Sequence, residues 1–319
     1  MLHTDIEALP RRKAEELLRM KDNSFGMTKS IGVVISSKEY KDYEEMIIKY
    51  IDNFNLEQIC QSGQCFRIKK AEDGGWKIIA ADRYLKIWQQ GRETRFYCDE
   101  EEYETVWREY FDLDTDYTSY MAQVNPKDEY LVQAVNFGKG MRILKQDLWE
   151  MIVSFLISQQ NNIVRIRRCI ENLCVKYGEK RENAWGESYY TFPKPETLAG
   201  LSEDALKECN LGYRSKYVVR GARSVVSGDV RLHEIEKMSY KKAKEALLQL
   251  FGVGEKVADC ICLFALHHLD AFPVDTHIHQ ALERHYKRGF PNRRYRGFRG
   301  VIQQYIFYYE LAGKMRKGK

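Results

Sequence analysis

The spacing of hydrophobic residues changes partway along the chain. Between about residues 29 and 120, apolar and aromatic residues gather in short runs, at 31–35, 75–90 and 92–98, and Gly74-Gly75 is a turn signal. Such runs predict a small antiparallel sheet accompanied by helices. After about Pro126, apolar residues recur at helical spacing, as in 148–160 and 161–174. These later segments therefore predict helices.

This change predicts an α+β protein with two domains. We expect an α+β N-terminal domain over residues 27–125 and a mainly helical domain over residues 126–319. Residues 1–26 include the charged, amphipathic stretch LPRRKAEELLRMKD. They form either an extension or a segment upstream of a start at Met27, and we assign them no role. Their frequent acidic residues argue against a transit peptide.

The composition indicates a folded protein with reduced cysteines. A chain of 319 residues with 44% hydrophobic residues can build a core, which excludes disorder throughout. The eight cysteines are scattered, without a CxxC pair or a secretory signal peptide. We therefore expect reduced thiols in an intracellular protein, which would be cytoplasmic or nucleoid-associated if the source is bacterial. We expect neither a structural zinc nor a four-cysteine iron–sulfur cluster. No run is long and apolar enough to span a bilayer.

The distribution of charge is more informative than the net charge of +5. Residues 284–299 carry seven Lys and Arg and no acidic residue, whereas residues 99–104 read DEEEYE. The basic run is equally compatible with a phosphate-facing surface and with a solvated face. The charge alone does not decide between them.

A glycine-rich turn lies between two helical patterns at Leu250–Cys260. Gly252 and Gly254 flank Val253 in a tight turn, with apolar residues at helical spacing on both sides. Glycine enters such turns at little steric cost. The first N–H groups of the following helix lack intrahelical acceptors and carry the positive end of the helix dipole. The segment therefore predicts a helix, a hairpin and a second helix able to hold a DNA phosphate.

Lys256 and Asp275 are the candidate chemical groups. Lys256 lies one or two residues into the second helix, where the dipole and partial burial favour a neutral, nucleophilic amine. Taken alone, it is slightly more suited to neutralising a phosphate. Asp275 follows Pro273 and Val274 and precedes a helical pattern, so it is a candidate N-cap. A fixed carboxylate near an amine can also stabilise positive charge at a sugar and assist proton transfer.

These segments together resemble the 8-oxoguanine DNA glycosylase family, within the helix-hairpin-helix, Gly/Pro-Asp superfamily of base-excision DNA glycosylases. The resemblance begins with GVGEKVADC and PVDTH and runs in family order from about Ile47 to Leu311. A hairpin motif alone would be weak evidence, but the combination is specific. The further matching segments are SGQCFR at 62–67, LGYRSKY at 211–217 and QQYIFYYEL at 303–311.

The resemblance implies a TATA-binding-protein-like N-terminal sheet domain and a set of pocket residues. Lys256 becomes the nucleophile that displaces the base and forms a Schiff base, and Asp275 its electrostatic and proton-transfer partner. The Gly63 carbonyl accepts a hydrogen bond from N7–H, which 8-oxoguanine has and guanine lacks. Phe307 and Cys260 sandwich the flipped base, and Gln303 bonds its Watson–Crick edge. From the residues alone, Gly63 is equally a turn glycine, and Phe307 and Cys260 are ordinary core residues.

The resemblance also implies contacts with duplex DNA. Gln160 occupies the position of an inserted polar wedge, where the family pattern has asparagine, and Tyr213 wedges beside it. Arg165 and Arg214 read an opposite cytosine, although simple phosphate contact is the alternative. His277 contacts a phosphate or is a surface residue. Further contacts come from the hairpin, at Gly252, Val253 and Gly254.

The implied activity is excision of 8-oxoguanine from duplex DNA, followed by β-elimination at the abasic site, by a monomer. No cofactor is required, although the backbone carbonyls of Leu248, Leu250 and Val253 are a candidate cation site. One alternative is a glycosylase for another damaged purine, such as an alkylated base. A monofunctional enzyme of that kind would need no lysine at position 256. The other alternative is a non-catalytic module that only grips DNA.

Overall fold

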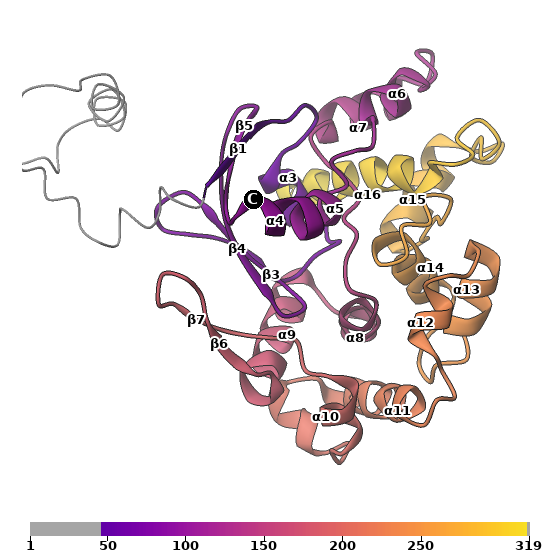
Figure 1. Cartoon of the computed structure of the whole chain (residues 1–319). Coiled ribbons are helices and arrows are strands. Elements are labelled where there is room, and N and C mark those ends of the chain that lie inside the picture. Colours follow the sequence, from indigo (N-terminus) through magenta and orange to yellow (C-terminus); the bar gives the residue numbers. More distant parts are fainter. Residues whose placement is uncertain (1–45, 318–319) are drawn as a thin grey trace, which may run out of the picture. The chain divides into compact units, whose positions relative to one another are not determined.

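A computed structural model of the chain describes residues 46–317 and the side chains of residues 46–313. All of them belong to one compact unit, Lys41–Lys319. The expected strand at 31–35 and the segment 1–26 lie outside the described residues. The rest of the α+β prediction is confirmed: an antiparallel sheet comes first and helices follow (Figure 1).

The sheet has five strands in the order β1-β5-β4-β3-β2, and all neighbours are antiparallel. The predicted runs at 75–90 and 92–98 form β3, β4 and β5, while β1 and β2 were not predicted. Short helical segments follow from Glu100 to Tyr110. The strands are β1 (Ile47–Tyr50), β2 (Ile68–Lys70), β3 (Trp76–Ala80), β4 (Arg83–Gln90) and β5 (Glu93–Tyr97), and α3 (Leu56–Gln61) lies between β1 and β2.

The helical part contains the predicted helix pair and the predicted hairpin. The segments 148–160 and 161–174 form α8 (Leu148–Ser158) and α9 (Ile163–Tyr177). The hairpin joins α13 (Tyr240–Leu247) to α14 (Glu255–Phe264), and α15 (Thr276–His285) and α16 (Arg299–Lys317) follow. The remaining helices are α6 (Tyr117–Ala122), α7 (Glu129–Gly138), α10 (Pro195–Ala199), α11 (Ser215–Val226) and α12 (Leu232–Ile235), with 3-10 turns at Ala205–Cys209 and Gly212–Arg214.

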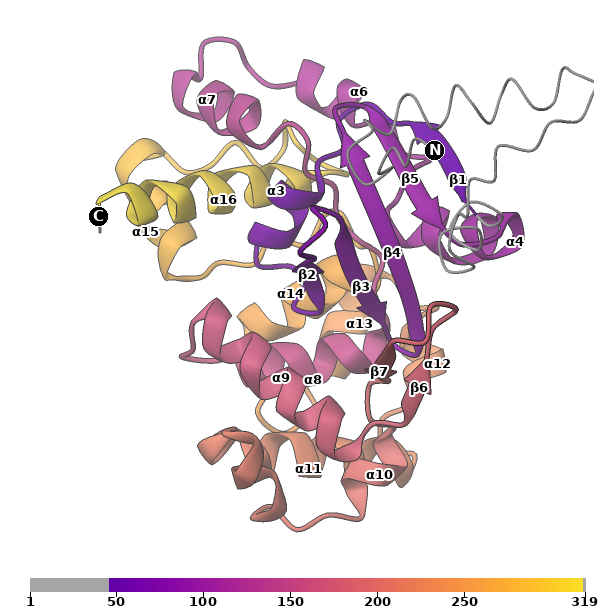
Figure 2. The same ribbon diagram turned by 90° about the vertical axis from the view of Figure 1, so that its left-hand side faces the viewer.

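Two clusters of buried side chains form the core. One lies under the sheet and the other among the helices. Tyr117 and Val124 pack in the helical cluster, whereas Leu144 packs under the sheet. Residues near the predicted boundary at 125/126 therefore serve both clusters. The C-terminal helix α16 lies beside α3 of the sheet domain (Figure 1), as the second view also shows (Figure 2).

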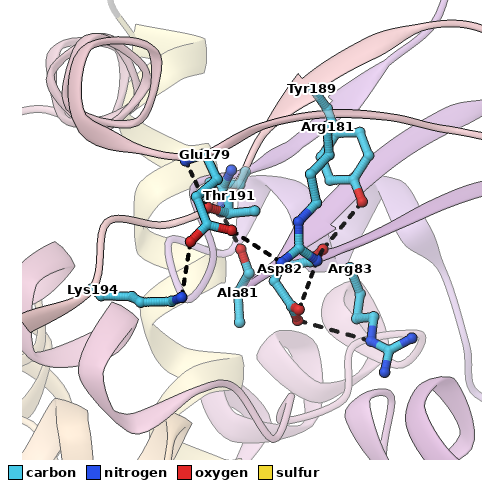
Figure 3. Close-up of polar contacts among 9 residues, drawn as sticks. Ala81, Asp82, Arg83, Glu179, Arg181, Tyr189, Thr191 and Lys194 are labelled. Atoms are coloured by element: carbon cyan, nitrogen blue, oxygen red, sulfur yellow. Dashed lines mark hydrogen bonds and ion pairs between the residues drawn. The ribbon is translucent and has the colours of Figure 1, made fainter.

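A second, two-stranded hairpin joins the helical part to the end of the sheet. Its strands, β6 (Lys180–Glu182) and β7 (Ser188–Tyr190), were not predicted. Arg181 donates to the Asp82 carboxylate at 2.8 Å, and the Tyr189 hydroxyl donates to the Asp82 carbonyl at 3.1 Å (Figure 3). Glu187 accepts two bonds of 2.8 Å from Lys77. These contacts join the hairpin to β3 and to the turn between β3 and β4.

A buried ion pair lies beneath this turn. Glu150 on α8 accepts from the Ala81 N–H at 2.8 Å and lies 3.5 Å from the Arg67 guanidinium. Arg67 also donates to the carbonyls of Ala81 and Tyr190. Burial raises the pKa of the Glu150 carboxyl, and the Arg67 charge opposes that shift. This group of contacts ties the sheet to α8.

We expect Glu150→Ala to lower the free energy of unfolding by about 3–5 kcal/mol, because it leaves the Arg67 charge buried without its partner. Glu187→Ala removes an exposed ion pair of the same domain contact, and its cost should stay below about 1 kcal/mol. Urea unfolding of both variants measures the two costs. Equal losses would show that the buried pair has no special part in joining the sheet to α8.

Candidate active site

A cavity of about 1290 Å³ brings together segments that are distant in the sequence. Its lining comes from the loop after α3, from α8, α9 and the turn between them, and from parts of α14, α15 and α16. Among the predicted site residues, those that line the cavity are Gly63, Gln160, Gly254, Lys256, Asp275, His277 and Phe307. Its floor includes the rings of Phe66 and Phe155. The cavity therefore combines apolar ring surfaces with a cation and a carboxylate.

Lys256 occupies the first turn of α14, whose N-cap is Gly254. Its side chain is half-buried, and Nζ lies 5.5 Å from the centroid of the Phe155 ring. A lysine in this place is opposed by the helix dipole and has lost part of its water. The amine therefore faces the cavity from the positive end of a helix.

Asp275 is the N-cap of α15, as the sequence indicates. Its Oδ1 accepts a hydrogen bond from the Ile278 N–H at 2.8 Å. Its Oδ2 lies 3.0 Å from Nδ1 of His277. Both carboxylate oxygens are thus held in place on the wall of the cavity that Lys256 also lines.

Gly63 and Phe307 face each other across the two halves of the protein. Gly63 has φ +74°, a conformation that favours glycine. A Cβ at this position would lie 3.1 Å from Cε1 of Phe307 and 3.7 Å from Cδ1 of Ile163. The Phe307 ring also makes an edge contact with the His277 ring at 5.8 Å. The glycine thus lets the main chain of the sheet domain approach the aromatic ring on α16.

Gln303 and Cys260 are buried and do not line the cavity. Gln303 lies four residues before Phe307, on the same face of α16. Its Nε2 donates to the Pro273 carbonyl at 3.0 Å, while its buried Oε1 has no hydrogen-bond partner among the described residues. Burial raises the pKa of the Cys260 thiol, although the Lys256 ammonium opposes this. Cys260 therefore behaves as a neutral thiol.

The α8–α9 turn presents Gln160 and is held by Arg214. Gln160 is exposed and has φ +47°, which is uncommon for a residue with a side chain. The Arg214 guanidinium is buried and donates to the carbonyls of Gln159 and Gln160 at 2.8 and 2.9 Å. In this structure the Arg214 side chain therefore stabilises the α8–α9 turn. Arg165 is exposed on α9 and Tyr213 is 47% exposed, so both are accessible to DNA.

The helical hairpin contacts this turn directly. Gln159 Nε2 donates to the Gly252 carbonyl at 3.0 Å. Gly252 has φ +91°, and a Cβ there would lie 2.6 Å from the Tyr217 ring. Gly252 is therefore required by backbone conformation and by close packing together. A Cβ on Gly254 would meet nothing within 4 Å, so the close approach of DNA at Gly254 stays a prediction.

The α13 and α14 helices are joined by polar contacts that sequence reasoning missed. Asp259 is buried and accepts from the Tyr240 hydroxyl at 2.6 Å and from Lys244 at 2.9 Å. Lys244 also pairs with Glu255 at 2.6 Å. An aspartate among the apolar residues of a helix is the signal that could have revealed this contact, because a buried carboxylate needs partners. These bonds fix the helix that carries Lys256.

Further features of the described residues concern metals, cysteines, membranes and the basic run. Among the described residues, no group of three His, Cys, Asp or Glu side chains could hold a metal. All eight cysteines are free and buried. Within the same part of the chain, no helix is long and apolar enough to cross a membrane. The basic run 284–299 belongs to the end of α15, the loop that follows it and the start of α16, outside the cavity.

Comparison with known proteins defines first a class and then a family. Residues 153–292 match the HhH-GPD superfamily of base excision DNA repair proteins, and residues 46–152 match the 8-oxoguanine DNA glycosylase N-terminal domain. The 8-oxoguanine glycosylase/lyase of Clostridium acetobutylicum, in complex with double-stranded DNA containing cytosine opposite 8-oxoguanine, is 35% identical, with a TM-score of 0.80 over 85% of this chain and 97% of that one. The protein belongs to the 8-oxoguanine DNA glycosylase family.

Two curated relatives carry the name N-glycosylase/DNA lyase. The protein from Saccharomyces cerevisiae is 38% identical over 160 residues, which are 47% of this chain and 43% of that protein. A probable N-glycosylase/DNA lyase from Methanothermobacter thermautotrophicus is 29% identical over 242 residues, covering 65% of this chain and 76% of that protein. The match thus spans less than half of the yeast protein and about three quarters of the archaeal one.

Proposed function

We propose that this protein excises 8-oxoguanine from duplex DNA and then cleaves the strand at the resulting abasic site. The observation that carries the proposal is the shared cavity: Lys256, Asp275, Gly63 and Phe307 all line it. A module that only grips DNA needs neither an amine and a fixed carboxylate in one cavity nor an aromatic wall. A monofunctional glycosylase has no need of the lysine.

The lysine carries both chemical steps. The neutral amine of Lys256 attacks the sugar C1′, the bond to the base breaks, and the base leaves with the bonding electron pair. Loss of a proton and opening of the sugar ring give a Schiff base, from which β-elimination expels the 3′ phosphate. Asp275 stabilises the positive charge that develops at the sugar and exchanges protons with the amine.

Selection of the damaged base falls to Gly63. Its carbonyl accepts a hydrogen bond from N7–H of 8-oxoguanine, whereas guanine would present a lone pair there. A buried acceptor left without a donor costs about 1–3 kcal/mol. Phe307, which lines the cavity, stacks on the flipped base. Cys260 is buried outside the cavity lining in this structure, so it encloses the base only when the pocket opens around it. The unpartnered Oε1 of Gln303 suits the N–H groups on the Watson–Crick edge of a guanine derivative.

The exposure of Gln160, Arg165 and Tyr213 supports the roles proposed for them at the DNA surface. Gln160 fills the gap in the duplex, and Tyr213 wedges beside it, because an unfilled stack costs a few kcal/mol. We assign Arg165 to the opposite strand, His277 to one phosphate, and the hairpin at Gly252–Gly254 to another. A cation at the hairpin would bind the carbonyls of Leu248, Leu250 and Val253. The Leu250 carbonyl accepts the Val253 N–H at 3.0 Å, which leaves its second lone pair for such an ion.

Borohydride trapping tests the whole proposal. The protein, incubated with a duplex that contains 8-oxoguanine, should form a covalent complex when borohydride reduces the Schiff base. A panel of lesions, each paired with all four opposite bases, compares 8-oxoguanine with alkylated purines. Absence of trapping, with the base still released, would favour a monofunctional glycosylase. Trapping with another lesion, and not with 8-oxoguanine, would support the Schiff-base mechanism but would show that the substrate is the other lesion.

Phe307→Ala should slow base excision by about ten- to a hundredfold, because the flipped base loses a stacking partner worth about 1–3 kcal/mol. Nicking of a preformed abasic site should change little, since no base occupies the pocket. Single-turnover assays on both substrates give the comparison. Equal losses in the two assays would mean that Phe307 only supports the core.

A further inference from the structure

We infer that Gln304 and Gln146 are positioning residues for damage recognition: they orient the Gly63 carbonyl by holding the carbonyls on either side of it. Gln304 Nε2 donates to the Ser62 carbonyl at 2.6 Å. Gln146 Nε2 donates to the Gln64 carbonyl at 2.8 Å. The inference rests on the proposed function of Gly63.

The side-chain amides of both glutamines are buried away from water. Gln304 is 2% exposed and Gln146 is 8% exposed. Ser62 and Gln64 are fully buried. Hydrogen bonds are stronger in such surroundings than in water, and a lost partner is costly. The two glutamines therefore constrain the segment firmly.

The Gln64 side chain adds a third anchor. Its Nε2 donates to the Ser62 hydroxyl and to the Arg142 carbonyl, both at 2.9 Å. Its Oε1 accepts from the Leu144 N–H at 2.9 Å. The segment around Gly63 is thereby tied to the connection between α7 and α8 as well as to α16. Among the described residues, no hydrogen bond is made to the Gly63 carbonyl itself.

Because peptide units are planar, these contacts determine the orientation of the Gly63 carbonyl. The bond to Ser62 fixes the peptide plane before Gly63, and the bond to Gln64 fixes the plane after the next residue. The Gly63 carbonyl belongs to the single peptide between these two anchored planes. Glycine by itself is conformationally permissive, so its neighbours must supply the rigidity. Hydrogen bonds weaken steeply as their angles deteriorate, and a tilt of this peptide would weaken the contact with N7–H.

Gln304 and Phe307, both on α16, contact the same segment of the sheet domain. Residues three apart lie on neighbouring positions of a helix face. Gln304 and Phe307 accordingly both meet the Ser62–Gly63 segment, Gln304 by its hydrogen bond and Phe307 by ring contact. One helix therefore carries both the ring that faces Gly63 and an amide that holds the segment. Lys256 lies on α14. Gln146 meets that helix through its backbone, because its N–H donates to the Phe264 carbonyl at 3.0 Å, and a side-chain substitution leaves this bond in place.

The test uses Gln304→Met and Gln146→Met, which keep the side-chain length and remove the amide. Single-turnover excision of 8-oxoguanine opposite cytosine should slow on the order of 10- to 100-fold, the size of effect expected from misplacing a recognition group. Cleavage of a preformed abasic site should stay within about twofold of the wild type, because it needs Lys256 and no base recognition. The ratio of the two rates is therefore the quantity to compare.

Ile306→Val is the matched control. Ile306 lies on the same helix, is fully buried and would lose one methylene without losing a hydrogen bond. Its rate ratio should equal that of the wild type. If Gln304→Met does not fold, Gln304→Glu keeps the size and replaces the donor, and Gln146→Met tests the other side of Gly63.

Two outcomes would overturn the inference: excision at the wild-type rate in both glutamine variants, or excision and abasic-site cleavage falling in equal proportion. Failure of the proposed function has a different signature. In that case the wild-type protein itself would not release 8-oxoguanine.

Discussion

Lys256→Gln should abolish covalent trapping and strand cleavage, while the variant should still bind a duplex containing 8-oxoguanine. The expected loss of excision is on the order of 10³-fold or more, because glutamine has no nucleophilic amine and water must attack unaided. Lys256 faces the cavity from the first turn of α14. Binding should survive because the hairpin backbone and the exposed residues of the α8–α9 turn remain intact.

The same variant separates the two interpretations of this lysine. If Lys256 only neutralised a phosphate, the substitution would weaken binding and reduce the salt dependence of affinity by about one counterion. Chemistry at saturating protein would then persist. Lys242→Gln is the matched control, because Lys242 is an exposed lysine on α13 outside the cavity. It should keep full excision and trapping. A Lys256→Gln variant that nicks at the wild-type rate would refute the assignment.

Local patterns predicted the elements whose cause is local. The α8–α9 pair follows from helical periodicity, and the run at 75–90 predicted strand, although not its division into β3 and β4 at Ala81–Asp82. β1 could not be predicted, because its four residues depend on pairing with β5, more than 40 positions away. β6 and β7 lie in a polar segment within the helical part. They gain their order from each other and from contacts such as Arg181 with Asp82.

The site residues also divide into those that local motifs predict and those that depend on tertiary contacts. Lys256 and Asp275 belong to short motifs, and their helix positions follow from those motifs. Gln304 could not be predicted, because its partner Ser62 lies 242 positions away. Arg214 illustrates a second limit. Whether an arginine faces DNA or binds main-chain carbonyls depends on the tertiary environment, and here the guanidinium holds the α8–α9 turn.

Asp275→Asn should separate the two roles of the aspartate, because asparagine is as good an N-cap as aspartate but carries no charge. The asparagine Oδ1 can still accept the Ile278 N–H, which Asp275 binds at 2.8 Å. The free energy of unfolding should therefore change by less than about 0.5 kcal/mol. Asp275→Ala loses the cap as well and should cost about 1 kcal/mol.

Excision by Asp275→Asn should nevertheless fall by about 10²- to 10⁴-fold, since the charge that stabilises the sugar cation and the proton acceptor are both lost. The matched control is Asp116→Asn, at the N-cap of α6, where the side chain accepts from the N–H groups of Thr118 and Ser119 away from the cavity. That variant should excise 8-oxoguanine at the wild-type rate. Thermal unfolding measures the stability of each variant, and single-turnover assays on the same preparations measure its excision rate. If Asp275→Asn excised the base normally, Asp275 would be a helix cap alone, and the charge opposite Lys256 would have to come from the DNA.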